Sequence, residues 1–261
     1  MRLEDYQSYY KVLIPIYQKI MVPQTRGEGW NVLAQLANDF RYNPLVWFIN
    51  NTTVKQKDYY THDEIIVYGE PGSGKTSYVI QSMLYVFEDV KEVRKRVVFD
   101  VDDLKQLLEN IKNKERYDVV LFDDPSAIGL SSSWNIRSTA EKRKMLELFD
   151  AFVYVKDFIS LIIFTVPRLI GVAKFFRDIA TWRVQVKKEG KVIFTRREVA
   201  STRSGTLKEI DTPVMFYVVK NPRMPDEIWN EMMEKRRKIV EERIERFNQS
   251  DEELEGNEND V

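Results

Sequence analysis

Short apolar runs alternate with longer amphipathic segments through the middle of the chain. The apolar runs have the length and β-branched content of buried strands, and they lie at Glu64–Tyr68, Arg96–Phe99, Asp118–Asp124 and Leu161–Val166. The amphipathic segments predict helices at Lys75–Asp89, from Asp100 or Asp102 to about Lys114, at Ser138–Phe158 and at Arg168–Ala180. Strands that alternate with helices form a parallel sheet covered on both faces. The pattern therefore predicts an α/β fold with a parallel central sheet flanked by helices.

The pattern changes after Trp182. The segment WRVQVKKEGKVIFTRRE alternates on both sides of Glu189-Gly190, which predicts a β-hairpin. Pro213–Val219 predicts one more strand, and Pro225–Phe247 predicts a charged helix. Residues 248–261 are acidic and poor in apolar side chains, which predicts a disordered tail.

The segment before the first predicted strand is rich in aromatic residues and is predicted to be helical, with interruptions at its prolines. Its aromatic residues Trp30, Trp47 and Phe48 are expected to pack on the core or to stack on an adenine ring, with core packing favoured. The predicted organisation is an aromatic-rich segment (1–57), an α/β core (58–220), a charged helix (221–247) and the acidic tail (248–261).

Composition excludes several classes of protein. Lys and Arg total 40 against 41 for Asp and Glu, so any contact with nucleic acid must come from local clusters of charge. The chain has no cysteine, which excludes disulfides, zinc–thiolate sites and thiol catalysis. The single histidine, His62, precedes an apolar run and is predicted to be a surface residue. The sequence has neither a signal-peptide pattern nor a membrane-length apolar run, and it predicts a cytoplasmic protein without membrane insertion.

The most specific motif is GEPGSGKT, whose spacing is G-x-x-x-x-G-K-[ST], the P-loop pattern. It lies between a predicted strand and a predicted helix, where backbone N–H groups point at an anion. Lys75 is expected to reach the β- and γ-phosphates, and the Thr76 hydroxyl to coordinate Mg²⁺. The motif predicts a phosphate site formed by Gly69, Glu70, Pro71, Gly72, Ser73, Gly74, Lys75, Thr76 and Ser77. The alternative is a tight turn.

Two aspartates end the next-but-one strand, in VVLFDDP. Asp123 fits the Walker B role of holding Mg²⁺, directly or through water. Asp124 is a candidate for orienting the attacking water, and its alternative role is to cap the following loop. Thr165, at the end of the fourth strand, is expected to hydrogen-bond the γ-phosphate or water, or to be satisfied at the strand end.

An arginine that neutralises charge on the transferred phosphate is expected in the region after the fourth strand. Arg177 is the preferred finger, supplied by a neighbouring subunit, and its alternative is a surface role. Other candidates are Arg137, Arg143, Arg168 and Arg183. The run NKER lacks the aspartate with which N-K-x-D reads guanine, and no D-x-x-G follows the third strand. ATP is therefore the expected nucleotide.

The motifs GEPGSGKTS, VVLFDDPSAI, IIFTV and FFRDIATWRVQV together resemble the core of a DnaA-like AAA+ ATPase, a P-loop NTPase of the additional-strand class. The layout is also similar to the P-loop ATPases predicted for archaeal spindle-shaped viruses and related plasmids. This resemblance implies that Leu161–Val166 lies between the P-loop strand and the Walker B strand. It places Arg177 near the finger position of such proteins. The predicted hairpin, strand and C-terminal helix differ from the helical lid that follows an AAA+ core.

The resemblance implies an ATPase that forms a homo-oligomer and acts on DNA as a replication-initiator-like protein. Basic clusters that are candidates for DNA contact are Lys91–Arg96, Glu141–Lys144, the hairpin run VKKEGK and Thr195–Glu198, although each is interleaved with acids. Three alternatives remain open. They are a motor for DNA packaging or transfer, a small-molecule or nucleotide kinase, and a nucleotide-gated interaction module with negligible hydrolysis.

Overall fold

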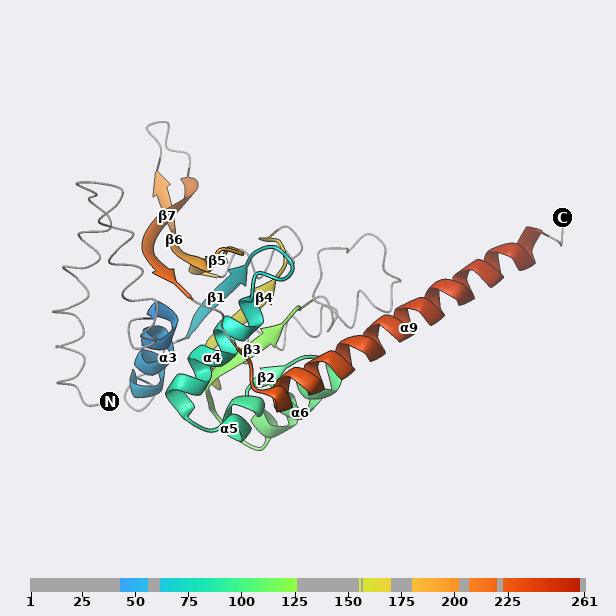
Figure 1. Ribbon diagram of the computed structural model, residues 1–261, viewed down its shortest axis with the longest axis horizontal. Coiled ribbons are helices and arrows are strands. Elements are labelled where there is room, and N and C mark those ends of the chain that lie inside the picture. The colour runs from blue at the N-terminus through green and yellow to red at the C-terminus, as the bar shows by residue number, and fades with distance from the viewer. Residues whose placement is uncertain are drawn as a thin grey trace.

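The structure is a computed structural model, and it describes residues 43–55, 62–125, 155, 157–169, 180–201, 207–219 and 223–258. The described strands form one sheet in the order β2-β3-β4-β1-β5-β6-β7 (Figure 1). The strands are β1 (Asp63–Tyr68), β2 (Val97–Val98), β3 (Tyr117–Asp123), β4 (Ile159–Val166), β5 (Trp182–Val186), β6 (Lys191–Ser201) and β7 (Leu207–Val218). The helices are α3 (Pro44–Lys55), α4 (Lys75–Phe87), α5 (Val90–Arg94), α6 (Val101–Lys112) and α9 (Asp226–Glu258).

The sheet is parallel through its centre and antiparallel at one edge. β1 pairs in parallel with β4 and β5, β4 with β3, and β3 with β2. β6 is antiparallel to β5 and to β7. The predicted α/β fold with a hairpin extension is confirmed, and so is the position of the fourth strand between the P-loop strand and the Walker B strand.

Each face of the sheet carries its own apolar cluster, because successive side chains of a strand point to opposite faces. On one face Ile65 and Val67 pack with residues of α3, α4 and α5, and with Ile228 and Met232 at the start of α9. On the other face Ile66 packs with residues of α6. The amino-terminal part of α9 therefore covers the same face as α4, the helix that follows the P-loop.

The aromatic residues of α3 belong to the core. Phe48 is buried, and its ring lies 4.8 Å from that of Trp182 and 6.1 Å from that of Phe194 between centroids. Trp47 packs against the same cluster. The favoured core-packing prediction is confirmed for these two residues, while Trp30 lies outside the described residues. Pro44 occupies the first helical position, where a backbone N–H would have no acceptor within the helix, so its missing N–H costs nothing. Asn43 caps the helix, because its Oδ1 accepts a hydrogen bond from the Leu45 N–H at 3.0 Å.

Several predicted elements have different limits in the structure, and some cannot be compared. β7 begins at Leu207, six residues before the predicted strand. α9 continues to Glu258, so the disorder predicted for residues 248–261 is wrong over most of its length. No proline follows Pro225, and elongating an existing helix requires little further ordering, so the acidic sequence prolongs α9. Residues 170–179 of the predicted helix Arg168–Ala180, and all but the end of the predicted helix Ser138–Phe158, lie outside the described residues.

The long helix α9 leaves the body of the molecule after its first turns and projects outward (Figure 1). Of the helices that the structure describes, none combines the length and apolar character needed to cross a bilayer.

His62 is not the surface residue that the sequence predicted. Its side chain is only 17% exposed, and its ring nitrogens lie 2.7 Å from the Ile159 carbonyl oxygen and 2.7 Å from Glu64 Oε1. The residue precedes β1 directly, and the parallel pairing of β1 with β4 brings the Ile159 carbonyl to the ring. Burial by itself lowers the pKa of His62, but the hydrogen bonds to Glu64 and Ile159 outweigh it, and the pKa is raised from 6.5.

We expect the stability of the fold to depend on the protonation of His62. Because the pKa of His62 is raised in the folded state, its stabilising contribution is complete below about pH 6.5 and disappears as the pH rises through the folded-state pKa. Urea unfolding across this range should show a free energy of unfolding that falls with pH, with a smaller fall in His62→Gln. Equal pH dependence in the two proteins would contradict this assignment.

Candidate nucleotide-binding site

The P-loop joins the end of β1 to the start of α4. Gly72 has φ +76° and Gly74 has φ +82°, left-handed conformations that glycine adopts without strain. Gly69 is required for a different reason, since a Cβ on this residue would lie 2.1 Å from the Val186 carbonyl oxygen of β5. The loop therefore packs against β5, and at its glycines no side chain covers the backbone on the side of the cavity.

The amino-terminal end of α4 offers unsatisfied donors to an anion. Gly74 is the N-cap residue and has no side chain with which to cap the helix, so the first N–H groups of α4 have no side-chain acceptor from this position. Ser73 is buried, and its Oγ has no hydrogen-bond partner among the described residues. Phosphate oxygens are the acceptors that such a helix start binds.

Lys75 lies across the loop that precedes it. Its Nζ donates to the carbonyl oxygens of Gly69 and Glu70, both at 2.9 Å. Burial lowers the pKa of Lys75, Asp123 acts against this, and the positive charge of Arg236 lowers the pKa further. The positive charge of the Lys75 ammonium group is therefore disfavoured by burial and by Arg236. A bound anion would stabilise this charge.

Asp123, Thr76 and Thr165 meet at the carboxyl ends of β3 and β4. Asp123 is 4% exposed, and its Oδ1 accepts from Thr76 Oγ1 at 2.6 Å and from Thr165 Oγ1 at 2.6 Å. The strand register pairs Asp123 with Thr165, which explains the second contact. The two hydroxyls hold the carboxylate in place, and the structure brings together three residues that the sequence singled out separately.

Asp124 follows β3 in a left-handed conformation, with φ +49°. Its N–H donates to the Thr165 carbonyl oxygen at 3.0 Å, which turns the chain at the end of the strand. Aspartate tolerates this conformation better than most residues because its short polar side chain can bond locally. Asp124 lines the same cavity as Lys75 and Asp123, as the water-orienting role requires.

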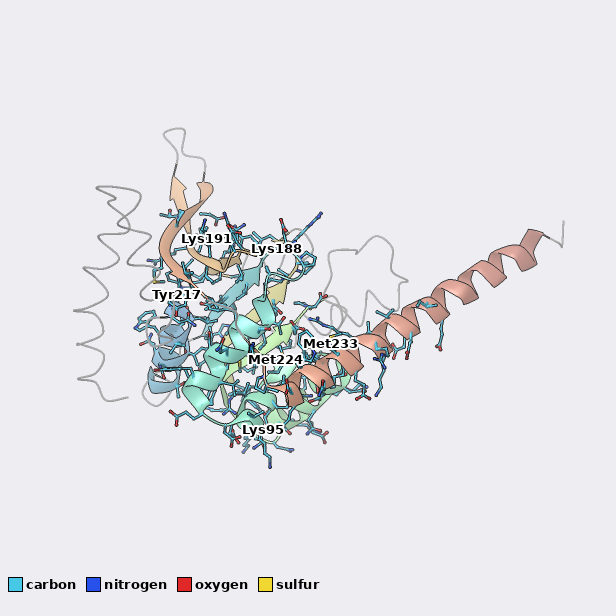
Figure 2. All side chains as sticks on the ribbon, in the orientation of Figure 1. Lys95, Lys188, Lys191, Tyr217, Met224 and Met233 are labelled. Atoms are coloured by element: carbon cyan, nitrogen blue, oxygen red, sulfur yellow. The ribbon has the colours of Figure 1, made fainter. Side chains whose placement is uncertain are left out.

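The cavity beside the P-loop has a volume of about 620 Å³, and one of its walls is α9. The sequence did not predict this wall. Its residues are Trp229, Met232, Arg236, Ile239 and Val240, with Met224 just before the helix. Figure 2 labels Met224, which precedes α9, and Met233, which lies within its first turns. The sequence feature that could have indicated this wall is the charged run EKRRK with its apolar neighbours. Acidic residues four positions away suggested instead that this run forms a solvent-exposed face of the helix.

The other predicted arginines do not enter this cavity or cannot be placed. Arg183 on β5 forms an ion pair with Asp211 of β7. Arg168 is exposed after β4 and does not line the cavity. Arg177, Arg137 and Arg143 lie outside the described residues.

Comparisons with known proteins relate part of this chain to a family of NTPases. A model of the family "Novel STAND NTPase 3" matches residues 52–170, a range that contains the P-loop, Asp123, Asp124 and Thr165. The chain contains a P-loop NTPase domain. Among curated proteins it is similar to the uncharacterized protein B-251 of Sulfolobus spindle-shape virus 1, with 20% identity over 201 residues, or 70% of this chain and 76% of the viral protein.

Two solved structures are also similar to this P-loop NTPase. The N-terminal domain of zonular occludens toxin from Neisseria meningitidis has 13% identity and a TM-score of 0.36, covering 62% of this chain and 96% of that one. A KaiC-like protein from Pyrococcus horikoshii OT3 has 13% identity and a TM-score of 0.33, and the match covers 60% of this chain and 89% of the KaiC-like chain. At these TM-scores the two structures say nothing about what this chain binds.

The residues at the P-loop of this NTPase fit a nucleotide with its Mg²⁺. Mg²⁺ in phosphate sites keeps several waters and takes one or two protein ligands besides the phosphates. The Thr76 hydroxyl and the Asp123 carboxylate, whose oxygens lie 2.6 Å apart, would provide such a pair of ligands. The bare loop and the start of α4 provide donors for the phosphates.

Several residues of the basic clusters that the sequence offered for DNA contact form ion pairs in the described part of the chain. In Lys91–Arg96, Arg94 pairs with Asp103 and Glu231, while Lys95 and Arg96 pair with Glu92. On the hairpin, whose Lys188 and Lys191 are labelled in Figure 2, Lys188 pairs with Glu70 at 3.0 Å. Glu141–Lys144 lies outside the described residues.

Proposed function

We propose that this P-loop NTPase hydrolyses ATP with Mg²⁺ and acts on DNA as a replication-initiator-like protein of an archaeal virus or plasmid. One observation supports the proposal of ATP hydrolysis most directly. Five residues with suitable chemistry line the same cavity: Lys75, Thr76, Asp123, Asp124 and Thr165. The resemblance of its motifs to DnaA-like AAA+ ATPases supports the DNA part, and the similarity to a protein of a spindle-shaped virus supports the viral origin.

Each residue has a distinct part in the proposed reaction. Lys75 and the N–H groups of the loop hold the β- and γ-phosphates, which spread negative charge over several oxygens. Mg²⁺, held by Thr76 and Asp123, supplies charge stabilisation at the phosphates when it is bound. Asp124 orients a water molecule toward the γ-phosphorus and accepts a hydrogen bond from it. Thr165 fixes the Asp123 carboxylate and so orients the metal ligand.

The proposal includes a homo-oligomer, in which Arg177 of one protomer reaches the γ-phosphate bound by its neighbour. Light scattering on the protein with and without nucleotide tests the assembly. Mixing Arg177→Ala protein with Asp124→Asn protein tests the finger, because only an arginine supplied in trans lets two inactive variants recover turnover together.

The first test is steady-state hydrolysis of ATP and of GTP, with and without single- and double-stranded DNA. We expect ATP to be preferred and DNA to raise the turnover. If about two phosphates are contacted, the DNA concentration that gives half of this rise should increase roughly tenfold between roughly 50 and 200 mM salt. Lys75→Ala protein purified in the same way measures contaminating ATPase activity.

The outcomes separate the candidate functions. Turnover that is indifferent to DNA at both salt concentrations would contradict the DNA role and turn attention to a kinase acceptor or a protein partner. Stimulation by any double-stranded DNA, without preference for sequence, would favour a packaging or transfer motor. Nucleotide binding without turnover in the wild type would identify a nucleotide-gated interaction module.

A further inference from the structure

Arg236, in the third turn of α9, reaches the centre of the nucleotide site from a distant part of the sequence. Its Nη2 donates to Asp123 Oδ2 at 2.7 Å, on the oxygen that Thr76 and Thr165 do not use. The Asp123 side chain is 3% exposed, whereas that of Arg236 is 46% exposed. The guanidinium group therefore approaches a buried carboxylate from the open side of the cavity.

The position of Arg236 is imposed by the way α9 docks. Ile228 and Met232, each 1% exposed, anchor the first turns of the helix in the core. Glu231 accepts from Arg94 Nε at 2.6 Å, which ties α9 to α5. One residue before Arg236, Lys235 Nζ lies 2.7 Å from Asp103 Oδ1, which ties α9 to α6.

These ion pairs hold charged groups that are partly buried. Burial raises the pKa of Asp103, but Lys235 and Arg94 outweigh it and hold the pKa below its ordinary value. The turn that carries Arg236 is therefore fixed by contacts that do not involve the nucleotide site. The arginine is presented to the cavity by a docked helix and is not brought there by its bond to Asp123 alone.

The charges around the cavity are suited to a polyphosphate. Arg236 and Lys75 line the same cavity, and the charge of Arg236 contributes to the lowered pKa of Lys75, after burial. A guanidinium group has five donors, and Asp123 is the single hydrogen-bond partner that the described residues give to Arg236. A phosphate group between Arg236 and Lys75 would reduce their electrostatic repulsion. Its oxygens would accept hydrogen bonds from the remaining N–H groups of Arg236.

We propose that Arg236 is a phosphate-binding residue that exchanges partners when the site is loaded. Without nucleotide it neutralises Asp123. With Asp123 engaged as a metal ligand, Arg236 would be released to bind the terminal phosphate of the nucleotide in the same chain. This inference rests on the proposed nucleotide site, and it assigns a cis arginine in addition to the finger expected at Arg177.

The exchange predicts opposite effects on two nucleotides. In Arg236→Ala, a non-hydrolysable triphosphate loses a charge-assisted contact, and we expect its affinity in Mg²⁺ to fall about 10- to 100-fold. ADP has no terminal phosphate at this position, and removal of a cation that competes with Mg²⁺ for Asp123 leaves its affinity unchanged or raises it. Arg236→Lys keeps the charge without the fork of donors and should retain part of the triphosphate preference.

The measurement is competition of each nucleotide against a fluorescent analogue, with the full chain, in Mg²⁺ and in EDTA. Arg237→Ala is the matched control, because Arg237 is exposed on the same turn and does not line the cavity. Equal losses for both nucleotides, or no loss for either, would overturn the proposal and leave Arg236 as a helix-docking residue. Failure of the wild type to bind any nucleotide would instead overturn the proposed function.

Discussion

Lys75→Ala is expected to lower the affinity for nucleotide or the turnover by about 10²-fold or more. The ammonium group is held at the P-loop by the carbonyl oxygens of Gly69 and Glu70, where the β- and γ-phosphates of a nucleotide would lie. Alanine removes the charge and the donors together, and no other described lysine lines the cavity to replace them. Equilibrium binding and steady-state hydrolysis measure the two losses separately.

The control for this variant must show that the fold survives. Among the described residues Lys75 forms hydrogen bonds only with the loop, so we expect the thermal midpoint of Lys75→Ala to stay close to that of the wild type. Lys188→Ala removes a lysine from the hairpin beside the loop, where it pairs with Glu70, and should leave nucleotide affinity and the turnover without DNA nearly unchanged. Wild-type turnover in Lys75→Ala would show that the phosphate site lies elsewhere.

Asp124→Asn is expected to lower turnover by about 10²- to 10⁴-fold while nucleotide binding persists. Asparagine is the variant of choice because, like aspartate, it tolerates the left-handed conformation of this residue, whereas alanine would add backbone strain to the loss of charge. The substitution removes the carboxylate that would orient and polarise the attacking water. It leaves the backbone bond from residue 124 to Thr165 available.

Single-turnover hydrolysis and equilibrium binding together test this assignment. A variant that binds Mg²⁺–ATP as tightly as the wild type and does not cleave it would identify Asp124 as the water-orienting residue. If Asp124→Asn hydrolyses ATP at the wild-type rate, the residue only turns the chain after β3, and another group must activate the water.

The positions of β1, β3 and β4 along the chain were predictable from their apolar runs, whereas the place of β4 between β1 and β3 was implied only by the family resemblance. The apolar runs of these strands are continuous because both faces of the sheet are covered, and such runs are hard to confuse with exposed segments. The contact of Thr165 with Asp123 was not predicted, since the sequence did not give the register in which β3 and β4 bring their carboxyl ends together.

Other features were not predictable, for different physical reasons. His62 was predicted at the surface because a lone polar residue before a strand usually lies there, but the carbonyl of Ile159, 97 residues away, provides it with a partner in a part-buried position. The end of α9 was placed too early because acidic composition predicts low burial, and a helix needs little burial to continue once it has begun.

The sequence by itself determined the phosphate-binding chemistry, because the P-loop is a contiguous motif whose geometry follows from eight neighbouring residues between a strand and a helix. Only the tertiary structure decided that α9 forms a wall of this cavity and that Arg236 meets Asp123, 113 residues away in sequence. Helical periodicity shows which residues share a face of a helix. It does not show which face meets the body of the protein, since that depends on the packing of Ile228 and Met232 and on the ion pairs of Lys235.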